Sequence, residues 1–285
     1  MKYIVSFSGG HSSALVAIEA VRKHGKDDVI LLNHDISSQV EHQDIKRFKN
    51  EVAEYLNIPI TYANADDFEN NPPLRVVRDK LFISPTGRIM CTYFLKTQPF
   101  EKYMRANFPA TPTKPNNKVT VLVGFEKTEY HRIQRRNTIL SAMGYMSEFP
   151  LAFWNRTIYQ TEEIGIERPV TYKIERHANC MGCLKAGIQH WYVVFILHRE
   201  IFDDAVAFEK ETGFHIHRDF RMEELIGKFE SMKCSGIVPD GVTNSHKFWA
   251  KVKKILAEHE EYSLPCECSE SFQDRCFESK NLLFV

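Results

Sequence analysis

The chain has 285 residues, of which 43% are hydrophobic and 26% charged, values typical of globular rather than disordered proteins. At roughly 150 residues per domain, this length predicts either two domains or one large domain with an appendage. The 37 Lys and Arg residues balance the 37 Asp and Glu residues. No overall charge therefore attracts a polyanion, and nucleic acid binding would need a local basic patch.

The sequence shows no pattern of a membrane or secreted protein. The longest apolar run, Trp191 to Leu197, is far shorter than the roughly 18 residues of a membrane span. The apolar residues that begin the chain end at Ser8 before a secretory signal could form. We therefore expect a cytoplasmic protein with no membrane partner. In a reducing compartment, its seven irregularly spaced cysteines favour metal or redox chemistry over a disulfide framework.

Strand and helix patterns alternate along the first part of the chain. They predict strands at residues 2–7, 29–32, 58–63 and 119–123, and helices at 14–24, 45–56 and 94–108. This order predicts an α/β fold with an open parallel sheet and helices on both faces. Residues 64–90 are polar and irregular, as in an active-site loop or an insertion. We expect this domain to span 1–195, followed by a helical C-terminal region, 196–285, with helices at 201–212, 222–233 and 245–259 and a polar tail.

A loop of small residues separates the first predicted strand from the first helix. Residues 6–13 read Ser-Phe-Ser-Gly-Gly-His-Ser-Ser. Ligands of parallel sheets bind beyond the carboxyl ends of the strands, where a loop that begins a helix offers backbone N–H groups to phosphate. The two glycines allow close approach, and the serine hydroxyls can donate to phosphate or cap the helix. Both a phosphate-binding loop and a plain glycine turn fit. The Walker and dinucleotide-binding patterns are absent.

Residues 6–13 resemble the PP-loop of N-type ATP pyrophosphatases, in particular the phosphoadenosine-phosphosulfate-reductase-like branch. The family pattern is Ser-Gly-Gly-x-Asp-Ser, and Ser12 stands in the Asp position. The resemblance implies an adenine nucleotide alpha hydrolase-like fold, with ATP and Mg²⁺ bound and ATP cleaved between the α and β phosphates. It places Asp35, after the second strand, near ATP or Mg²⁺; a solvated strand-end acid is the alternative. The ATP contacts that it implies are Ser6, Ser8, Gly9, Gly10, Ser12, Ser13, Asp35 and Gly124.

A second resemblance concerns the cysteines. The segment around Cys91 resembles Cys-Cys-x-x-Arg-Lys-x-x-Pro-Leu of iron-sulfur adenylyl-sulfate reductases, with Lys96 in register. Thr92 replaces the second cysteine of that pattern, and a Cys-x-x-Cys pair, Cys180 and Cys183, follows downstream. Three thiolates resemble the site of PP-loop enzymes that thiolate tRNA, which implies a [4Fe-4S] cluster with one iron lacking a protein ligand and Lys96 as its charged neighbour.

Other interpretations of the cysteines stay open. Zn²⁺ could be bound by the same three cysteines with His177 or His190, or the cysteines could be buried thiols. The tail contains Cys266, Cys268 and Cys276. Glu267-Cys268 matches only the first two residues of the Glu-Cys-Gly-Leu-His motif of thioredoxin-dependent reductases. Incidental thiols on a flexible tail, or a sulfur-relay or metal role, fit these three cysteines.

A basic segment follows the fourth predicted strand. Residues 124–136 resemble the glycine, acid and arginine segment of the same branch. Arg132, Arg135 and Arg136 are three and four residues apart, so they share a helix face that could bind phosphates. A solvated helix face is the alternative interpretation.

These resemblances cover residues 1 to about 195 and imply an ATP pyrophosphatase that adenylylates a nucleic acid oxygen for sulfur insertion. A backbone phosphate oxygen would give DNA phosphorothioation, which we favour, and a base oxygen would give tRNA thiolation. The residues expected to be catalytic are Ser12, Lys96 and Arg132. The expected partners are DNA rather than tRNA, a separate cysteine desulfurase and, as an option, a second copy of the chain. A sulfonucleotide reductase and a zinc-stapled nucleotide-binding subunit are the alternatives.

Overall fold

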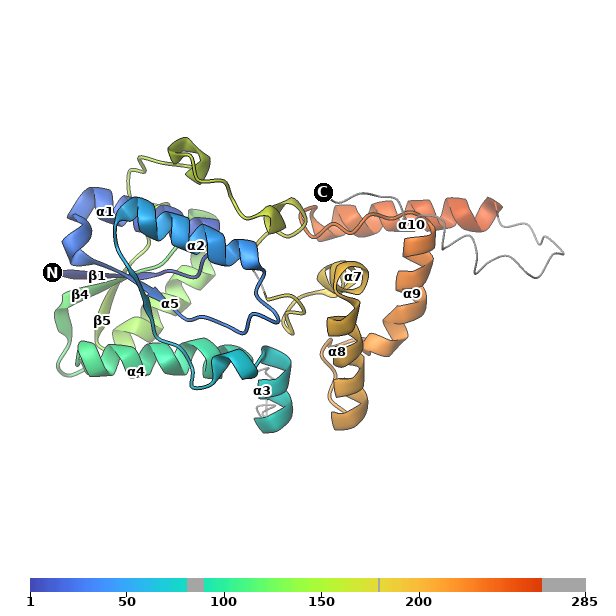
Figure 1. Cartoon of the computed structure of the whole chain (residues 1–285), viewed down its shortest axis with the longest axis horizontal. Helices are drawn as coiled ribbons and strands as arrows, with labels where there is room; N and C mark the ends of the chain where they lie inside the picture. The colour runs from blue at the N-terminus through green and yellow to red at the C-terminus, as the bar shows by residue number, and fades with distance from the viewer. Residues whose placement is uncertain (81–89, 179, 263–285) are drawn as a thin grey trace. The chain divides into compact units, whose positions relative to one another are not determined.

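The structure, a computed structural model, describes residues 1–80, 90–178 and 180–262. It divides into two compact units, Met1–Lys185 and Ala186–Val285. The boundary thus precedes helix α7 (Ile188–Leu197), whereas the boundary predicted from the sequence, at residue 195, falls near its end. The reason is that α7 packs on the helices that follow it, with Phe195 against Phe202 and Phe229. Figure 1 shows the course of the chain.

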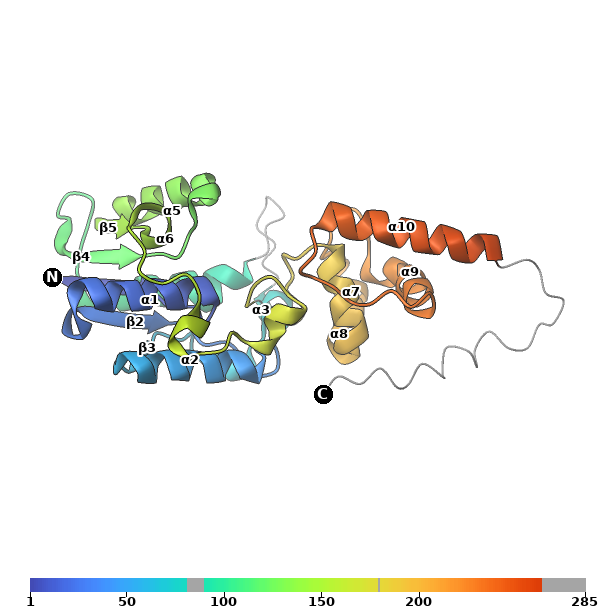
Figure 2. The ribbon, with the colours of Figure 1, turned by 90° about the horizontal axis from the view of Figure 1, so that it is seen from above.

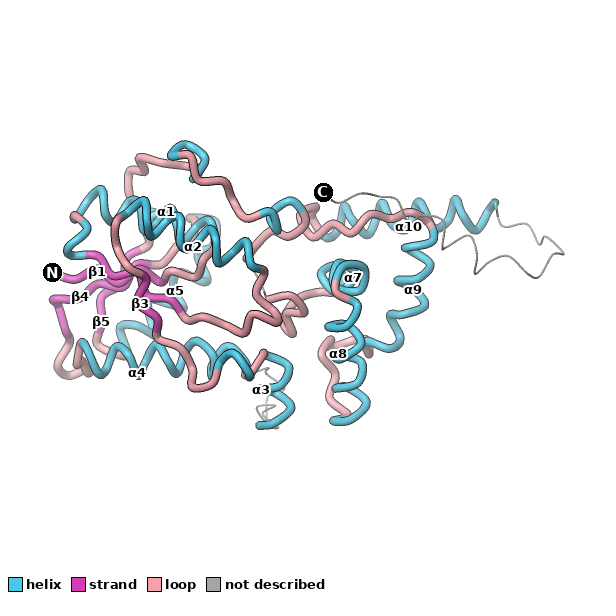
Figure 3. The backbone as a smooth tube through the Cα atoms, viewed as in Figure 1, coloured by secondary structure: helices cyan, strands magenta, loops and turns pink. Residues whose placement is uncertain are grey.

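The first unit is built on a five-stranded sheet in which every pair of neighbours is parallel. Its order is β3-β2-β1-β4-β5. The strands are β1 (Lys2–Ser6), β2 (Val29–Asn33), β3 (Ile60–Tyr62), β4 (Asn116–Leu122) and β5 (Tyr145–Glu148). Figure 3 shows them gathered in magenta at the centre of this unit. The predicted α/β fold with a parallel sheet is confirmed, and β5 is an additional strand.

Helices cover both faces of the sheet, because consecutive strand residues point to opposite sides. On one side Val5 and Leu31 belong to a core shared with α1 (His11–His24) and α2 (Gln43–Leu56). On the other side Ile4 and Leu32 belong to a core shared with α4 (Gln98–Asn107) and α5 (Tyr130–Ala142). Figure 1 shows α1 and α2 above the strands and α4 below them, and Figure 2 looks onto α1 and α2 from above. The two layers leave the strand ends open to loops.

Two segments differ from the predicted pattern. Within the polar stretch 64–90, the structure contains a helix, α3 (Pro73–Lys80), where the sequence predicted irregular chain; residues 81–89 lie outside the described part. The helix predicted from residue 94 begins earlier, at Cys91, and includes a π-helical stretch, Tyr93–Thr97, before α4. Such π-helical insertions are frequent at functional sites.

A long connection, residues 154–178, follows the short helix α6 (Pro150–Phe153); we call it the strap. Side-chain carboxylates of two helices hold it. The buried Glu19 of α1 accepts hydrogen bonds from the backbone N–H groups of Thr157 and Ile158, the latter at 3.0 Å. Asp44 of α2 accepts from the N–H of Val170 at 2.6 Å. Figure 3 shows the strap as a pink tube interrupted by short helical turns.

The second unit contains α7, α8 (Arg199–Thr212), α9 (Met222–Cys234) and α10 (Ser245–Tyr262). Its core is aromatic: the ring centroids of Tyr192 and Phe229 lie 5.4 Å apart. The buried Glu209 accepts from the backbone N–H groups of Ile216 and Met222, at 2.7 and 2.6 Å. The predicted helical C-terminal region is confirmed. Among the helices of the described residues, none is long and apolar enough to cross a membrane.

Candidate functional site

The candidate site lies at the carboxyl edge of the sheet. From β1 the chain adds β2 and β3 on one side and later β4 and β5 on the other, so the direction reverses between β1 and β4. Open α/β sheets bind ligands at this switch point. The Ser8–Ser13 loop follows β1 there, and Gly124 follows β4. A Cβ on Gly124 would lie 2.9 Å from the carbonyl oxygen of Ser12, so only glycine allows this approach.

The loop has the geometry of an anion-binding helix start. Gly9 has φ +79°, and Gly10 is the N-cap of α1, whose first turn contains no acidic residue. The carbonyl of Gly10 accepts from the hydroxyl of Ser13 at 2.7 Å, which fixes the turn. Ser8 and Ser12 are exposed. Backbone N–H groups and the positive end of the helix dipole favour phosphate at such a position.

Ser6, the remaining serine predicted to contact ATP, is the last residue of β1 and pairs in register with Leu32. It is half-buried within the sheet. Its side chain thus belongs to the strand rather than to the loop.

A buried group of three charges supports the loop. The Lys49 side chain is 1% exposed, and its Nζ lies 3.0 Å from both Asp35 Oδ1 and Glu41 Oε2. Its methylene groups lie against Gly9, where a Cβ would come within 2.7 Å of Lys49 Cγ. We call Lys49, Asp35 and Glu41 the charge triad. Asp35 is therefore the partner of a buried lysine rather than a solvated strand-end acid.

The charge triad sets the ionisation of its members. Burial opposes the charge of Asp35, but the hydrogen bond and charge of Lys49 outweigh it and hold the Asp35 pKa below its ordinary value. Burial dominates at Glu41 and raises its pKa. For Lys49, burial is outweighed by the two carboxylates, which raise its pKa. A lysinium and an aspartate thus stand beside the loop at neutral pH.

Lys49 and Glu41 were not among the residues predicted from the sequence. The position of Lys49 offered a signal. Lys49 lies in a helix whose buried residues include Ile45, Phe48 and Val52, and a lysine on a buried face needs a buried partner. The sequence offered no comparable signal for Glu41, which lies in a turn before α2.

The structure places the three predicted cysteines near enough to one another for each to affect the ionisation of another. Cys91 begins the helix that leads into α4, while Cys180 and Cys183 flank a turn in which Gly182 has φ +70°. The N–H of Met181 donates to the carbonyl of Val40 at 2.8 Å, which holds this turn. The pKa of Cys180 is raised to about 11, chiefly by burial and also by Cys183 and Cys91. Burial also raises the pKa of Cys91, again with a contribution from Cys183.

Two lysines lie near these thiols. Lys185 donates from Nζ to the Thr92 hydroxyl at 2.9 Å, and its charge lowers the pKa of Cys91 against the effect of burial. Lys96 acts in the same direction on Cys180. Lys96 thus occupies the neighbourhood expected of it, whereas Lys185 was not predicted. We call Cys91, Cys180 and Cys183, with these two lysines, the thiol cluster.

The donor set of the thiol cluster suits a soft metal, since thiolates bind zinc and iron-sulfur clusters. No group of three or more His, Cys, Asp or Glu side chains among the described residues is arranged to hold a metal ion as it stands. Of the histidines suggested as further zinc ligands, His177 is exposed and His190 belongs to α7, in the other unit. The three cysteines are thiols, not bridged to another cysteine of the described part.

The arginines of the predicted helix face differ in their exposure to solvent and in their contacts. Arg132 is 62% exposed, but its guanidinium lies 4.2 Å from the centroid of the Phe125 ring and it forms an ion pair with Glu129. Arg136 lies 5.0 Å from the ring centroid of Phe100, and burial lowers its pKa. Arg135 is exposed. Phosphate binding by these arginines stays a prediction.

His34, which the sequence analysis missed, also lies at this edge. It follows β2, and its Nδ1 lies 2.5 Å from the carbonyl of Ala63, to which it donates in the neutral form. Burial lowers its pKa, and the charges of Lys96 and Arg136 lower it further. An imidazole that is neutral at pH 7 therefore lies near Lys96 and Arg136.

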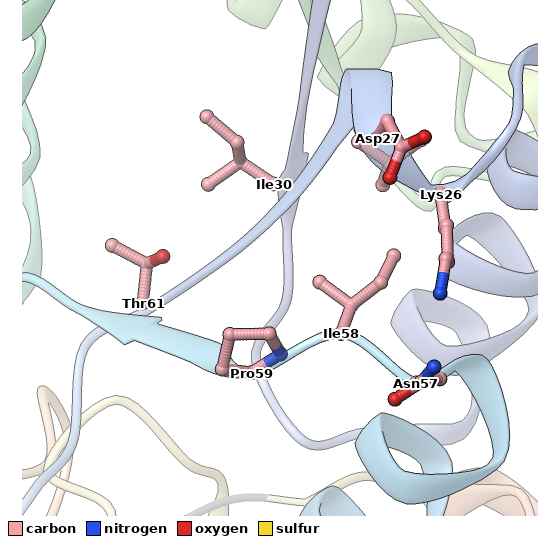
Figure 4. Close-up of a pocket in the computed structure, with 8 residues that line it drawn as sticks. Lys26, Asp27, Ile30, Asn57, Ile58, Pro59 and Thr61 are labelled. Carbon is pink, nitrogen blue, oxygen red and sulfur yellow. The ribbon is translucent and has the colours of Figure 1, made fainter.

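Hollows elsewhere on the first unit contain none of the predicted residues. One, drawn in Figure 4, is lined at the amino ends of β2 and β3 by Lys26, Asp27, Val29, Ile30, Asn57, Ile58, Pro59 and Thr61. A second lies beside α1 at Trp154. The first is at the sheet edge opposite to the glycine loop, where parallel sheets do not bind their ligands.

Comparisons with known proteins add no assignment. No protein-family model matches the chain, and no curated protein is detectably similar to it in sequence.

Replacing Lys49 tests how much the charge triad contributes to the free energy of unfolding. Lys49→Met leaves two carboxylates buried without their cation, so we expect the free energy of unfolding to fall by about 3–5 kcal/mol at pH 7. The deficit should shrink as the pH is lowered, because without the cation both carboxyl groups have raised pKa values in the folded state and protonation relieves the buried charge. Urea denaturation at several pH values measures both effects.

Lys46→Met is the matched control for this experiment. Lys46 Nζ lies 3.9 Å from Asp35, and its side chain is 33% exposed, so its loss should cost less than about 1 kcal/mol. Equal losses for the two variants, or a Lys49→Met deficit independent of pH, would contradict the role given to the charge triad.

Proposed function

We propose that this chain is an ATP pyrophosphatase that activates a nucleic acid oxygen for replacement by sulfur. The observation that carries the proposal is the proximity of the glycine loop and the thiol cluster. A Cβ on Gly10 would lie 3.7 Å from Ala178 Cβ, two residues before Cys180. In addition, the charge of Glu41 raises the pKa of Cys180, and Glu41 belongs to the charge triad beneath Gly9. The proposed phosphate site and the proposed sulfur site thus lie at one sheet edge.

The first chemical step uses the glycine loop. ATP would place its β and γ phosphates on the N-terminus of α1, with the exposed Ser8 and Ser12 as hydroxyl donors and Ser13 bound to the Gly10 carbonyl within the turn. An acceptor oxygen attacks the α phosphorus, the new P–O bond forms, and the bond to the β phosphate breaks with its electron pair on pyrophosphate. Backbone N–H groups stabilise the leaving charge, and Mg²⁺, which Asp35 could help to place, would neutralise it.

The second step uses the thiol cluster. A cysteine desulfurase supplies sulfur as a persulfide, and a thiol reductant such as excess cysteine reduces this sulfur to sulfide with two electrons, itself becoming a disulfide. The sulfide attacks the activated centre, the new bond to sulfur forms, and AMP leaves with the acceptor's original oxygen and the bonding electron pair. Cys91, Cys180 and Cys183 would hold a [4Fe-4S] cluster, which supplies an iron without a protein ligand as a place for sulfur. Lys96 and Lys185 favour negative charge at this position. Arg132 is the arginine proposed to meet the acceptor.

DNA phosphorothioation is the version of this reaction that we favour, because the glycine loop and cysteine segments resemble the reductase-like branch. The acceptor would then be a non-bridging phosphate oxygen. Modification of a tRNA base oxygen uses the same two steps. A sulfonucleotide reductase would instead use a tail thiol such as Cys268, which lies outside the described residues. A zinc-stapled nucleotide-binding subunit would bind ATP without turnover.

Pyrophosphate release tests the first step. We expect the anaerobically purified chain, supplied with Mg²⁺, DNA, a desulfurase and cysteine, to convert ATP to AMP and pyrophosphate. A Ser8→Ala, Ser12→Ala double variant should lose at least about tenfold in rate, since each hydroxyl offers a hydrogen bond to a charged phosphate. Formation of ADP, or no turnover with either DNA or tRNA, would contradict the proposal; sulfite release from adenylyl sulfate would favour the reductase.

Metal and acid-labile sulfide analysis tests the thiol cluster. We expect about four irons and four sulfides per chain, the content of the proposed cluster, and their loss in Cys183→Ser. Cys268→Ser, in the tail, is the matched control and should retain them. A colourless protein with one zinc per chain, or equal iron in both variants, would remove the iron-sulfur cluster from the mechanism.

A further inference from the structure

The hydroxyl of Tyr172, on the strap, lies directly on the glycine loop. The backbone N–H of His11, the first residue of α1, donates to Tyr172 Oη at 2.9 Å. A Cβ on Gly10 would lie 3.3 Å from the same oxygen. A tyrosine 161 residues away in the sequence thus reaches the helix start at which phosphate is proposed to bind.

The hydrogen bonds of this hydroxyl leave its proton available. Tyr172 Oη accepts from the N–H of His11 and also from the N–H of Ala178. A phenolic oxygen can accept and can donate one proton. Among the described residues, the hydrogen bonds of Tyr172 are of the accepting kind. Burial raises the Tyr172 pKa, so the proton is present at neutral pH.

Several contacts fix the ring in this place. The N–H of Thr161 donates to His11 Nε2 at 3.3 Å, which holds the strap on the first residue of α1. The Val170 N–H, two residues before the tyrosine, is bound by Asp44. The centroids of the His11 and Tyr172 rings lie 6.5 Å apart, edge to face. The hydroxyl is therefore positioned before any ligand arrives.

We propose that Tyr172 is a phosphate ligand of this site, donating its hydroxyl proton to an oxygen of the pyrophosphate portion of bound ATP. The inference rests on the proposed function, because it takes the glycine loop as the phosphate site. Two backbone N–H groups orient the phenol, and the third direction at its oxygen remains for the ligand. A neutral donor suits this place, because it binds the polyanion without adding a charge beside the charge triad.

The test compares Tyr172→Phe with Tyr159→Phe, a matched change on the same strap at a residue 62% exposed to solvent. Calorimetry with the full chain measures the binding of ATP, inorganic pyrophosphate and AMP, each with Mg²⁺. We expect Tyr172→Phe to weaken ATP and pyrophosphate by about tenfold and to leave AMP unchanged, because one hydrogen bond to a charged group is lost. Tyr159→Phe should match the wild type for all three ligands.

Other outcomes overturn the inference. Unchanged binding means that Tyr172 does not touch the ligand, tighter binding means that its hydroxyl blocks the site, and equal weakening of AMP means that the ring only supports the fold. If the wild-type chain binds ATP with the expected Tyr172 dependence but releases no pyrophosphate, the ligand role stands and the proposed function fails. If it binds neither ATP nor pyrophosphate, both fail.

Discussion

The bond network of Lys49 with Asp35 and Glu41 is the interaction on which the candidate site depends. Its lysine is almost fully buried and lies beneath Gly9, so it sets the floor of the glycine loop. Burying three charges costs free energy that well-packed apolar side chains of similar size would not. Stability alone therefore does not explain why three charged residues occupy this buried position. The charge triad keeps the Asp35 carboxylate ionised at the carboxyl edge, beside a loop at the positive end of the α1 dipole, which favours negative charge.

The sheet and the strap place the other segments of the candidate site beside the charge triad. The parallel sheet places the ends of β1, β2 and β4 side by side, and the switch point between β1 and β4 leaves the loop uncovered by a crossover helix. The strap then crosses the helix start and ends at the cysteine turn. The glycine loop and the cysteine turn thus lie close together because one connection links them. In the proposed reaction, this proximity removes the need for a reactive intermediate to diffuse between two sites.

Much of the architecture followed from sequence patterns. Continuous apolar runs such as residues 29–32 are typical of parallel strands, and the loop after Ser6 is marked by its glycines. The short strand Tyr145–Glu148 was missed because two of its four residues are polar. The boundary predicted at residue 195 lies about ten residues after the boundary between the two units of the structure. The apolar run in α7 has no local feature showing that it packs on the helices after it.

The unpredicted parts of the site depend on contacts between distant residues. Glu41 matters through its bond to Lys49, and Lys185 through its approach to Thr92, 93 residues earlier. Tyr172 lies in a segment without periodicity, so its place on His11 follows only from the folded strap. The resemblance to iron-sulfur enzymes grouped Cys91, Cys180 and Cys183 as the ligands of one proposed cluster. Their proximity in the fold agrees with that grouping, while the metal stays a prediction.

The central claim is that the glycine loop and the cysteine turn form one site. Amide hydrogen exchange of the full chain, read by mass spectrometry with and without Mg²⁺ and a non-hydrolysable ATP analogue, tests it directly. The account predicts that exchange slows both in residues 8–14 and in the strap and cysteine turn, residues 170–185, with α8 in the second unit unchanged. Slower exchange confined to the loop, or none in either segment, would contradict it.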